Sequence, residues 1–372
     1  MNLTEEQTQE LNRQNQLLKQ YMSNHFSPAK IKQLIEEFTF SEIRKLLGEL
    51  DIEFFGRYYL GRYLDKPFCN FHQDLIKNVR EIITKYSVST PQEIDKFRSE
   101  KVGEKLLTIA PRGHGKSKIS NVLLSLWLLL YGKSPFILLV SANQALAEEF
   151  LECIKDEIEF NNKILEDFSL MKGKVWNAGE IQLINNTYLV AKGIRSKFRG
   201  ISRGSWRVAT LILDDLESDQ QARSEIQTEE IKEIFKKSVL SVGDKYTDIF
   251  YLGTIISENT MIYEMHKFWT GWEKLFYKAV LSFSDSPLWE TWEKIYTDLS
   301  NPNNVVDADK FFNENKAEML AGTQVLWEEK NDYYYLMKKK VDEGDIAFYS
   351  ELQNDPRSSD EFIFKPRICV NS

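Results

Sequence analysis

The chain has 372 residues, of which 42% are hydrophobic and 13% aromatic, so it can bury a large core. Its formal net charge of −8 argues against a protein that coats nucleic acid over its whole surface and confines polyanion binding to part of that surface. The three cysteines, Cys69, Cys153 and Cys369, lack metal-ligand spacing and indicate a reducing compartment. The most apolar run, residues 122–131, is too short to span a bilayer, and we expect a soluble intracellular protein.

The N-terminal part reads as helical. Residues 3–50 carry apolar side chains at helical spacing among Glu, Gln and Lys, which predicts two or three amphipathic helices. The aromatic-rich stretch 54–63 is expected to be core. Gln73 then follows a Phe-His pair, and its side-chain amide offers a donor and an acceptor that suit the N6/N7 edge of adenine. Residues 86–104 are polar, carry turn signals and are interpreted as a surface linker.

Residues 105–117 read as a buried strand that runs into a glycine-rich turn and then a helix. Gly113 and Gly115 let successive backbone N–H groups point into one concavity, which predicts a phosphate-binding loop. In such a loop Lys116 reaches the β- and γ-phosphates of ATP, and the hydroxyl of Ser117 ligates Mg²⁺. The G-x-x-x-x-G-K-[ST] pattern begins here with alanine instead of glycine. The nucleotide contacts expected from the loop backbone and side chains are Pro111, Gly113, His114, Gly115, Lys116 and Ser117.

A glutamine just ahead of a phosphate loop is where several nucleic-acid-dependent ATPases hold adenine, so Gln73 is predicted to contact the nucleotide. The alternative interpretation of the whole segment is a glycine turn with a surface lysine. The order of strand, loop and helix favours the phosphate loop.

The next elements predict a parallel sheet. Residues 135–140 form a second buried strand, and a helix follows from 142 to 160, so strand and helix alternate in the βαβ manner. Residues 161–180 are read as irregular, and residues 181–192 as two short strands turning at an Asn-Asn pair. The segment 193–207 is the most basic stretch of the chain and is interleaved with glycines.

Residues 208–213 predict a buried strand that ends in carboxylates, at the edge where ligands bind in open α/β sheets. Asp214 is predicted to bind Mg²⁺ through water or together with Ser117, and a second carboxylate to orient the water that attacks the γ-phosphate. Asp215 and Glu217 both compete for that second role. Asp215 is adjacent to Asp214, whereas Glu217 has the longer reach and is slightly favoured for that reason.

A further buried strand is predicted at residues 247–254 and ends in Gly-Thr. The hydroxyl of Thr254 at its tip can sense the γ-phosphate or water and pass its loss to a neighbouring segment. Between the two strands, residues 224–239 predict a charged amphipathic helix with a solvated face.

Taken together, these motifs resemble the ATPase half of a tailed-bacteriophage terminase large subunit, over about residues 50–365. The stretches that carry the resemblance are Phe71–Asp74, Ala110–Ser117, Gly193–Gly200, Leu211–Glu217, Leu252–Thr254, Ser286–Trp292 and Phe348–Pro356. The ordered set is specific, although each motif alone is not.

The resemblance implies an α/β fold: a P-loop NTPase of the ASCE (RecA-like) class, with a three-layer domain around a central, mainly parallel sheet. It implies N-terminal helices at 1–60, the ATPase core at 61–260, and a small linker or lid subdomain at 261–372. In that family a nuclease domain follows, and its metal-binding aspartates are not part of this sequence. Nuclease activity is therefore not expected, and a truncated chain and a split gene are both open explanations.

The function implied is that of a DNA-packaging motor that uses ATP and Mg²⁺. Such a motor hydrolyses ATP to translocate double-stranded DNA through the portal into a procapsid, in the host cytoplasm and not in the mature virion. The implied partners are the portal protein, the small terminase subunit and further copies in a homo-oligomeric ring, a pentamer by family resemblance. No membrane is implied.

The resemblance also assigns two arginines. Arg199 matches the residue that completes the neighbouring subunit's site in trans, with Arg195 and Arg203 as weaker alternatives, and such a finger stabilises charge that develops on the γ-phosphate. Arg112 matches an arginine of the phosphate loop that contacts phosphate or couples to the carboxylates. A solvated or DNA-facing loop is the alternative interpretation of the whole basic stretch.

Two other classes of protein remain open from the sequence. A superfamily-two-type helicase also uses an upstream glutamine and two nucleotide motifs, but it needs a second motor domain, and no further motif set follows Thr254. A binding module that uses nucleotide only as a switch would share the loop without turnover.

Overall fold

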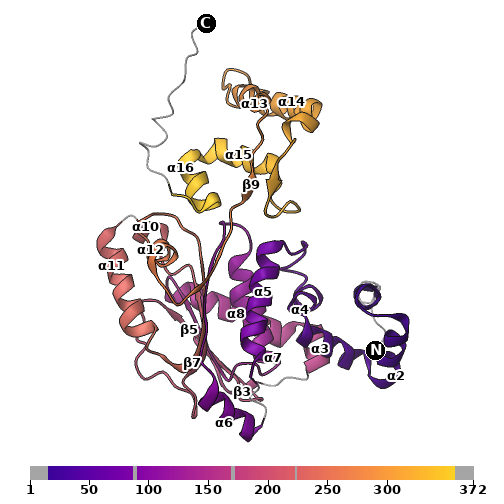
Figure 1. Ribbon diagram of the computed structural model, residues 1–372, viewed down its shortest axis with the longest axis vertical. Helices are drawn as coiled ribbons and strands as arrows, with labels where there is room; N and C mark the ends of the chain where they lie inside the picture. Colours follow the sequence, from indigo (N-terminus) through magenta and orange to yellow (C-terminus); the bar gives the residue numbers. More distant parts are fainter. Residues whose placement is uncertain (1–15, 87–89, 169–171, 223, 357–372) are drawn as a thin grey trace.

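An eight-stranded sheet organises the chain (Figure 1). The computed structural model describes residues 16–86, 90–168, 172–222 and 224–356. The order of the strands in the sheet is β3-β4-β5-β2-β6-β7-β1-β8. The last six strands of this order are parallel to one another, whereas β4 pairs antiparallel with β5, and β3 pairs antiparallel with β4. The strands are β1 (Lys105–Ile109), β2 (Phe136–Ser141), β3 (Lys172–Trp176), β4 (Glu180–Leu183), β5 (Tyr188–Gly193), β6 (Val208–Asp214), β7 (Gly243–Gly253) and β8 (Glu273–Phe276). The predicted α/β fold with a mainly parallel sheet is confirmed.

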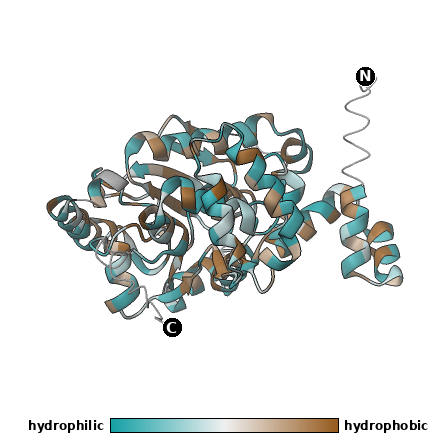
Figure 2. Ribbon diagram, turned by 90° about the horizontal axis from the view of Figure 1, so that it is seen from above, coloured by the Kyte–Doolittle hydropathy of each residue, from teal (hydrophilic) through white to brown (hydrophobic). Residues whose placement is uncertain are grey.

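Helices cover both faces of this sheet, so the domain has three layers. Successive strand side chains point to opposite faces, and accordingly Leu106 belongs to one core cluster and Leu107 to the other. Figure 2 shows hydrophobic strands running between the helices. One face carries α4 (Ile52–Tyr59), α5 (Asn70–Thr84), α7 (Ser125–Leu130) and α8 (Gln144–Phe160), and the other carries α11 (Glu225–Ile234), the π-helix η2 (Phe235–Val239) and α12 (Met261–Phe268) (Figure 1).

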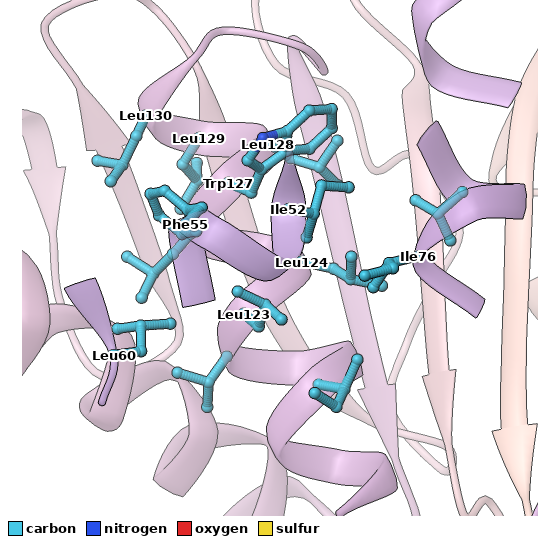
Figure 3. Close-up of a cluster of buried hydrophobic side chains, with 14 of the residues drawn as sticks. Ile52, Phe55, Leu60, Ile76, Leu123, Leu124, Trp127, Leu128, Leu129 and Leu130 are labelled. Carbon is cyan, nitrogen blue, oxygen red and sulfur yellow. The ribbon is translucent and has the colours of Figure 1, made fainter. Parts of the chain in front are cut away.

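The most apolar run of the chain is a buried helix. It begins as the π-helix η1 (Lys118–Leu124), directly after the glycine-rich turn, and continues as α7. All residues from 119 to 130 are buried, because a helix that is apolar all round must be covered on every side. Figure 3 shows Trp127 and Phe55 of α4 in this core. In the part of the chain that the structure describes, no helix is both long enough and apolar enough to cross a membrane.

Two regions differ from the sequence interpretation. The predicted surface linker contains α6 (Pro91–Glu100), whose first turn is closed by a capping box between Thr90 and Glu93. Its Phe97 is buried against β7, and Lys101 forms a buried ion pair with Asp248 of that strand at 3.0 Å. The linker interpretation was wrong because these few tertiary contacts outweigh a polar composition.

The region 161–180, interpreted as irregular, contains α9 (Asn162–Phe168) and the edge strand β3. The buried Asp167 of α9 accepts hydrogen bonds from Arg44 of α3 (Phe40–Leu50) and from Tyr59, the latter at 2.7 Å. This contact joins the N-terminal helices to the core. Ahead of α3 lies α2 (Pro28–Glu37), at one side of the molecule (Figures 1 and 2). The prediction of amphipathic N-terminal helices is confirmed for the described residues.

The C-terminal residues 279–356 form a separate small lobe next to one end of the sheet (Figure 1). Its elements are β9 (Val280–Ser282), α13 (Leu288–Tyr296), α14 (Asn304–Met319), β10 (Gln324–Val325), α15 (Tyr333–Glu343), α16 (Asp345–Ala347) and the π-helix η3 (Phe348–Leu352). The lobe has aromatic clusters of its own, in which Trp289 and Trp292 pack against Tyr334. Strand β8 lies within residues 261–372, the region predicted as a linker or lid subdomain, but it belongs to the main sheet.

Charged side chains mark both outer edges of the sheet. At one edge, β3 carries the exposed residues Lys172 and Lys174. At the other, β8 carries Glu273 and Lys274, and only its inner side pairs with β1. The short helix α10 (Asp219–Ala222) lies in the connection that follows β6.

Candidate nucleotide-binding site

The carboxyl ends of the central strands meet at one edge of the sheet. Ile109 at the end of β1 pairs with Gly253 at the end of β7, and Asp214 at the end of β6 is in register with Leu252 and Ser141. The loops after β1, β6 and β7 therefore converge, as expected for the binding edge of an open α/β sheet. One strand, β7, separates β1 from β6, which is the order of the ASCE class. The chain thus has the P-loop NTPase fold that the sequence predicts.

The glycine-rich turn has the backbone of an anion cradle. Gly113 and Gly115 adopt φ angles of 76° and 79°, which glycine reaches without strain. The N–H groups of Gly113, His114 and Gly115 donate to no acceptor in the described part of the chain. Unpaired N–H groups at the start of a buried helix offer donors to a phosphate.

Lys116 lies inside this cradle. Its ammonium donates to the carbonyl oxygen of Pro111 at 3.1 Å and to Oγ1 of Thr254 at 2.7 Å. Burial lowers the pKa of Lys116, and the charges of Asp215 and Asp214 oppose that shift. The lysine, the threonine and the two aspartates named in the sequence are thus brought together.

Asp214 is buried beside the start of the loop helix. Its Oδ2 accepts a hydrogen bond from the amide of Asn121 at 2.8 Å, whereas its Oδ1 has no hydrogen-bond partner among the described residues. Burial and the charge of Asp215 raise the pKa of Asp214 well above its usual range, and the neighbouring Ser117 and Asn121 oppose the shift.

These oxygens suit a hard cation. Mg²⁺ is held in proteins by one or two carboxylates together with water and substrate phosphates, rather than by a full protein cage. The free oxygen of Asp214 and the hydroxyl of Ser117 fit that pattern. Among the described residues there is no group of three or more His, Cys, Asp or Glu side chains that could hold a metal ion.

The two candidates for the second carboxylate lie in different surroundings. Asp215, with a φ of 37°, accepts a hydrogen bond at Oδ1 from the backbone N–H of Thr254 at 3.1 Å. Glu217 instead accepts from the N–H groups of Met261 at 2.8 and 3.0 Å and of Ile262 at 3.4 Å, and so caps α12. Burial raises the pKa of Glu217 to about 7. Asp215 therefore faces Lys116 and Thr254, and Glu217 faces a helix terminus.

Thr254 connects the parts of the site. Its hydroxyl accepts from Lys116 and donates to the carbonyl oxygen of Ala110 at 3.1 Å, while its N–H holds Asp215. The next residue, Ile255, donates its N–H to Asn354 of the C-terminal lobe at 2.9 Å. A group bound at Lys116 would thus affect the contacts of Thr254 at the tip of β7 and, through Ile255, the contact with the C-terminal lobe.

Arg112 contacts the C-terminal lobe. Its guanidinium forms an ion pair of 2.9 Å with Glu351, and its backbone N–H donates to the carbonyl oxygen of the same residue at 2.9 Å. Both side chains are partly exposed, so the pair can reorganise at low cost. The predicted contact of Arg112 with phosphate would require that reorganisation.

Gln73 is not brought together with the other predicted site residues. It is exposed on the first turn of α5 and faces Glu53 of α4, next to Ile76 and Arg80. The neighbouring His72 faces the loop instead, because consecutive helical residues point about 100° apart. Sequence order placed the glutamine near the loop but could not fix its direction.

The basic segment follows β5 at the same sheet edge. Arg195 is paired with Glu230 and Arg203 with Glu180, whereas Arg199 is exposed and has no ionic partner within the described residues. Four strand spacings separate β5 from β1, about 19 Å at the usual ~4.8 Å per strand. The segment that carries Arg199 therefore begins four strands away from β1, the strand that leads into the phosphate loop.

Several contributors to the site were not predicted as site residues from the sequence. Asn121 orients Asp214, His72 contacts the loop backbone, and Gln144 accepts at Oε1 from the N–H of Gly193 at 3.0 Å, which fixes the base of the basic segment. The only available signal was position: Asn121 lies one helical turn after Ser117. Glu351 of the C-terminal lobe lies in the stretch Phe348–Pro356, but its contact with Arg112 was not predicted.

No protein-family model matches the chain, and no curated protein matches its sequence. Solved structures of phage large terminases do match. The HK97 bacteriophage large terminase shares 13% identity, with 69% of this chain and 56% of that chain covered and a TM-score of 0.35. The large terminase of the thermophilic bacteriophage D6E shares 10% identity over 63% of this chain and 52% of that chain, with a TM-score of 0.34.

The ATPase domain of the Thermus phage P74-26 large terminase, an arginine-to-alanine mutant, shares 11% identity over 74% of this chain and 96% of that chain, with a TM-score of 0.35. Other structures of the D6E terminase contain ADP and ATP-γ-S. The chain thus spans little more than half the length of the HK97 and D6E terminases. At such low identity and TM-score, its function rests on the chemistry of its own site.

Proposed function

We propose that this chain is the ATPase part of a terminase large subunit and hydrolyses ATP to move double-stranded DNA. The observation that carries the proposal is the convergence of Lys116, Asp214, Asp215 and Thr254 at a glycine cradle with unpaired N–H groups. A cationic, N–H-lined cradle beside carboxylates suits a nucleoside triphosphate. The ordered motifs described above narrow the class of ATPase to the terminase family.

In the proposed reaction the loop holds the triphosphate. The N–H groups of the cradle bind its oxygens, and Lys116 leaves Pro111 and Thr254 to contact the β- and γ-phosphates. Asp214 and Ser117 would hold Mg²⁺, which supplies charge neutralisation on the phosphate oxygens when bound. Since Lys116 exchanges partners, Thr254 is released from it and can report the state of the γ-phosphate.

Asp215 is the better placed of the two carboxylates to orient the attacking water. It faces Lys116, whereas both oxygens of Glu217 already accept N–H groups of α12. In the proposed mechanism, therefore, Asp215 takes the role for which Glu217 was slightly favoured from its reach.

Arg199 is proposed to act on a second copy of the chain. It is exposed and has no ionic partner among the described residues, and its segment begins four strands away from β1, so it is available to a neighbour's site. There it would stabilise charge on the γ-phosphate. This role implies a ring, a pentamer by family resemblance, with the portal protein, the small terminase subunit and double-stranded DNA as partners in the host cytoplasm, outside the mature virion.

The test compares the wild type with Lys116→Ala, and with Lys310→Ala, an exposed lysine of the C-terminal lobe, as the matched control. The wild type and the control should release phosphate from MgATP faster when double-stranded DNA is added. Lys116→Ala should bind MgATP more weakly and show no turnover, because the phosphates lose their buried cation.

The outcomes separate the alternatives. Tight binding of MgATP by the wild type without turnover would favour a nucleotide switch over a motor. Separation of the two DNA strands would favour a helicase. Turnover by Lys116→Ala equal to that of the control would refute the assignment of the loop.

A further inference from the structure

Two buried histidines flank the Gly115 turn of the phosphate loop. His72 is 1% exposed and His114 is 0% exposed. Nε2 of His72 lies 2.7 Å from the carbonyl oxygen of His114, and Nδ1 of His72 lies 3.2 Å from the backbone nitrogen of Cys69. His72 therefore bridges the start of α5 and the backbone of the loop.

The two contacts determine the tautomer of His72. The N–H of Cys69 can only donate, so Nδ1 must accept. The carbonyl oxygen of His114 can only accept, so the ring proton must be on Nε2. His72 is thus neutral, with its single N–H directed at the loop.

The ring is also held in place from the C-terminal lobe. Trp327 packs edge-on against His72 with ring centroids 4.6 Å apart, and its Nε1 donates to the carbonyl oxygen of Pro67 at 2.8 Å. A Cβ atom at Gly115 would lie 3.5 Å from Nε2 of His72 and 3.6 Å from Trp327. The imidazole therefore lies between Trp327 and the Gly115 turn.

The hydrogen bond fixes the direction of one peptide group. In a trans peptide the C=O and the N–H point in opposite directions. Because His72 draws the carbonyl of His114 towards α5, the N–H of Gly115 points the other way and has no protein acceptor among the described residues. That N–H is one of the donors of the cradle.

We propose that His72 is a positioning residue of the phosphate loop: its Nε2–H holds the His114–Gly115 peptide so that the Gly115 N–H faces the phosphates of the nucleotide. The inference rests on the proposed function, since it needs a nucleotide at the loop. In the Phe-His-Gln stretch, the sequence predicted only Gln73 as a nucleotide contact, and this inference assigns a role to the preceding residue, His72.

The test uses the full chain and two substitutions that differ in one hydrogen bond. His72→Gln retains a side-chain N–H within reach of His114, whereas His72→Phe fills the space without a donor. His25→Phe, at an exposed histidine, is the matched control. MgATP affinity is measured by titration with a fluorescent ATP analogue, and thermal unfolding confirms that each variant is folded.

His72→Phe should bind the analogue about tenfold more weakly, because a buried carbonyl loses its partner and the peptide is free to turn. His72→Gln should recover most of that loss, and His25→Phe should bind like the wild type. In histidine-¹⁵N-labelled wild type, NMR should show the proton of His72 on Nε2. Equal affinity of His72→Phe and the wild type, or a proton on Nδ1, would overturn the inference.

The test also separates this inference from the proposed function. A wild type that fails to bind MgATP refutes the nucleotide site itself. A wild type that binds, with a His72→Phe variant that binds equally well, leaves the site standing and removes only the role of His72. If His72→Phe does not fold, the affinity of His72→Gln relative to the wild type and the NMR tautomer decide.

Discussion

At the scale of single residues, the two carboxylates that follow Asp214 have different hydrogen-bond partners. Asp215 is held by the N–H of Thr254 beside Lys116, while Glu217 is occupied by the first N–H groups of α12. Asp215 and Glu217 are only two residues apart in the sequence, but their side chains lie in different surroundings. The backbone of Asp215 has a φ of 37°, and the chain turns here, so that the two side chains point to different places.

This separation predicts different kinetic effects. Asp215→Asn should lower kcat by about 100-fold or more with little change in KM, because general-base or water-orienting groups contribute about 10²–10⁴. Glu217→Gln, which keeps an acceptor for α12, should change kcat only a few-fold. Steady-state phosphate release at saturating MgATP checks both, and a large loss of kcat in Glu217→Gln alone would reverse the assignment.

Part of the site could be predicted from the sequence because strand order determines it. Lys116, Asp214 and Thr254 each follow a buried strand, and the ends of parallel strands share one edge. The contacts of His72, Asn331 and Glu351 could not be predicted, since they join residues far apart in the chain. The amide of Asn331 lies 3.3 Å from the ring of His114, 217 residues away. The direction in which a helical side chain points could not be predicted either, since Gln73 faces Glu53 of α4 and not the phosphate loop.

At the scale of elements, α12 depends on a side chain from outside the helix. Its N-cap residue, Thr260, makes no side-chain cap, and Glu217 accepts the first N–H groups instead. A carboxylate at a helix N-terminus satisfies unpaired donors and interacts favourably with the helix dipole. The tip of β6 is thereby fastened to the helix that follows β7.

Removing this cap should therefore destabilise the fold. Glu217→Ala is expected to lower the free energy of unfolding by about 1–3 kcal/mol, since buried N–H groups of α12 lose their acceptor. Glu314→Ala, at an exposed glutamate of α14, serves as the control and should change it little. Urea unfolding followed by circular dichroism measures both, and equal midpoints would contradict the capping role.

Most elements could be predicted because their hydrophobic residues form a clear pattern in the sequence. The elements that were missed have a weak hydrophobic pattern. Strands β1, β2 and β6 and the second half of β7 are mostly apolar and buried, and these strands were predicted within a few residues. Helix α6 and strand β3 were missed, because each buries few side chains and reads as polar. The π-helical turns of η1 were not predicted either, because no residue pattern in the segment distinguishes them from α-helical turns.

At the scale of the whole molecule, the two buried histidines make stability depend on pH. Burial lowers the pKa of His72 and of His114 to about 4, from an ordinary value of 6.5, and the charge of Lys330 acts in the same direction on both. Lys116 adds to the effect on His114. Both side chains are therefore neutral in the folded protein where they would be charged in the unfolded chain.

The sign of the effect follows from proton binding. As the pH falls from 6.5 towards 4, the unfolded chain takes up protons that the folded protein does not, so the free energy of unfolding should decrease. His72→Gln removes one of these sites and should show a shallower decrease. Urea unfolding of both proteins at about pH 7 and about pH 5 tests this. A constant difference between them would show that His72 does not contribute.

The charged outer strands of the sheet restrict how copies of this chain can associate. An uncovered strand edge is a template for joining sheets end to end, and lysines on such an edge oppose that joining. With Lys172 and Lys174 on β3 and Glu273 and Lys274 on β8, both edges carry charges that oppose strand addition. Copies of this chain are therefore expected to associate through helices and connecting segments, which can separate and re-form while every backbone ladder stays intact.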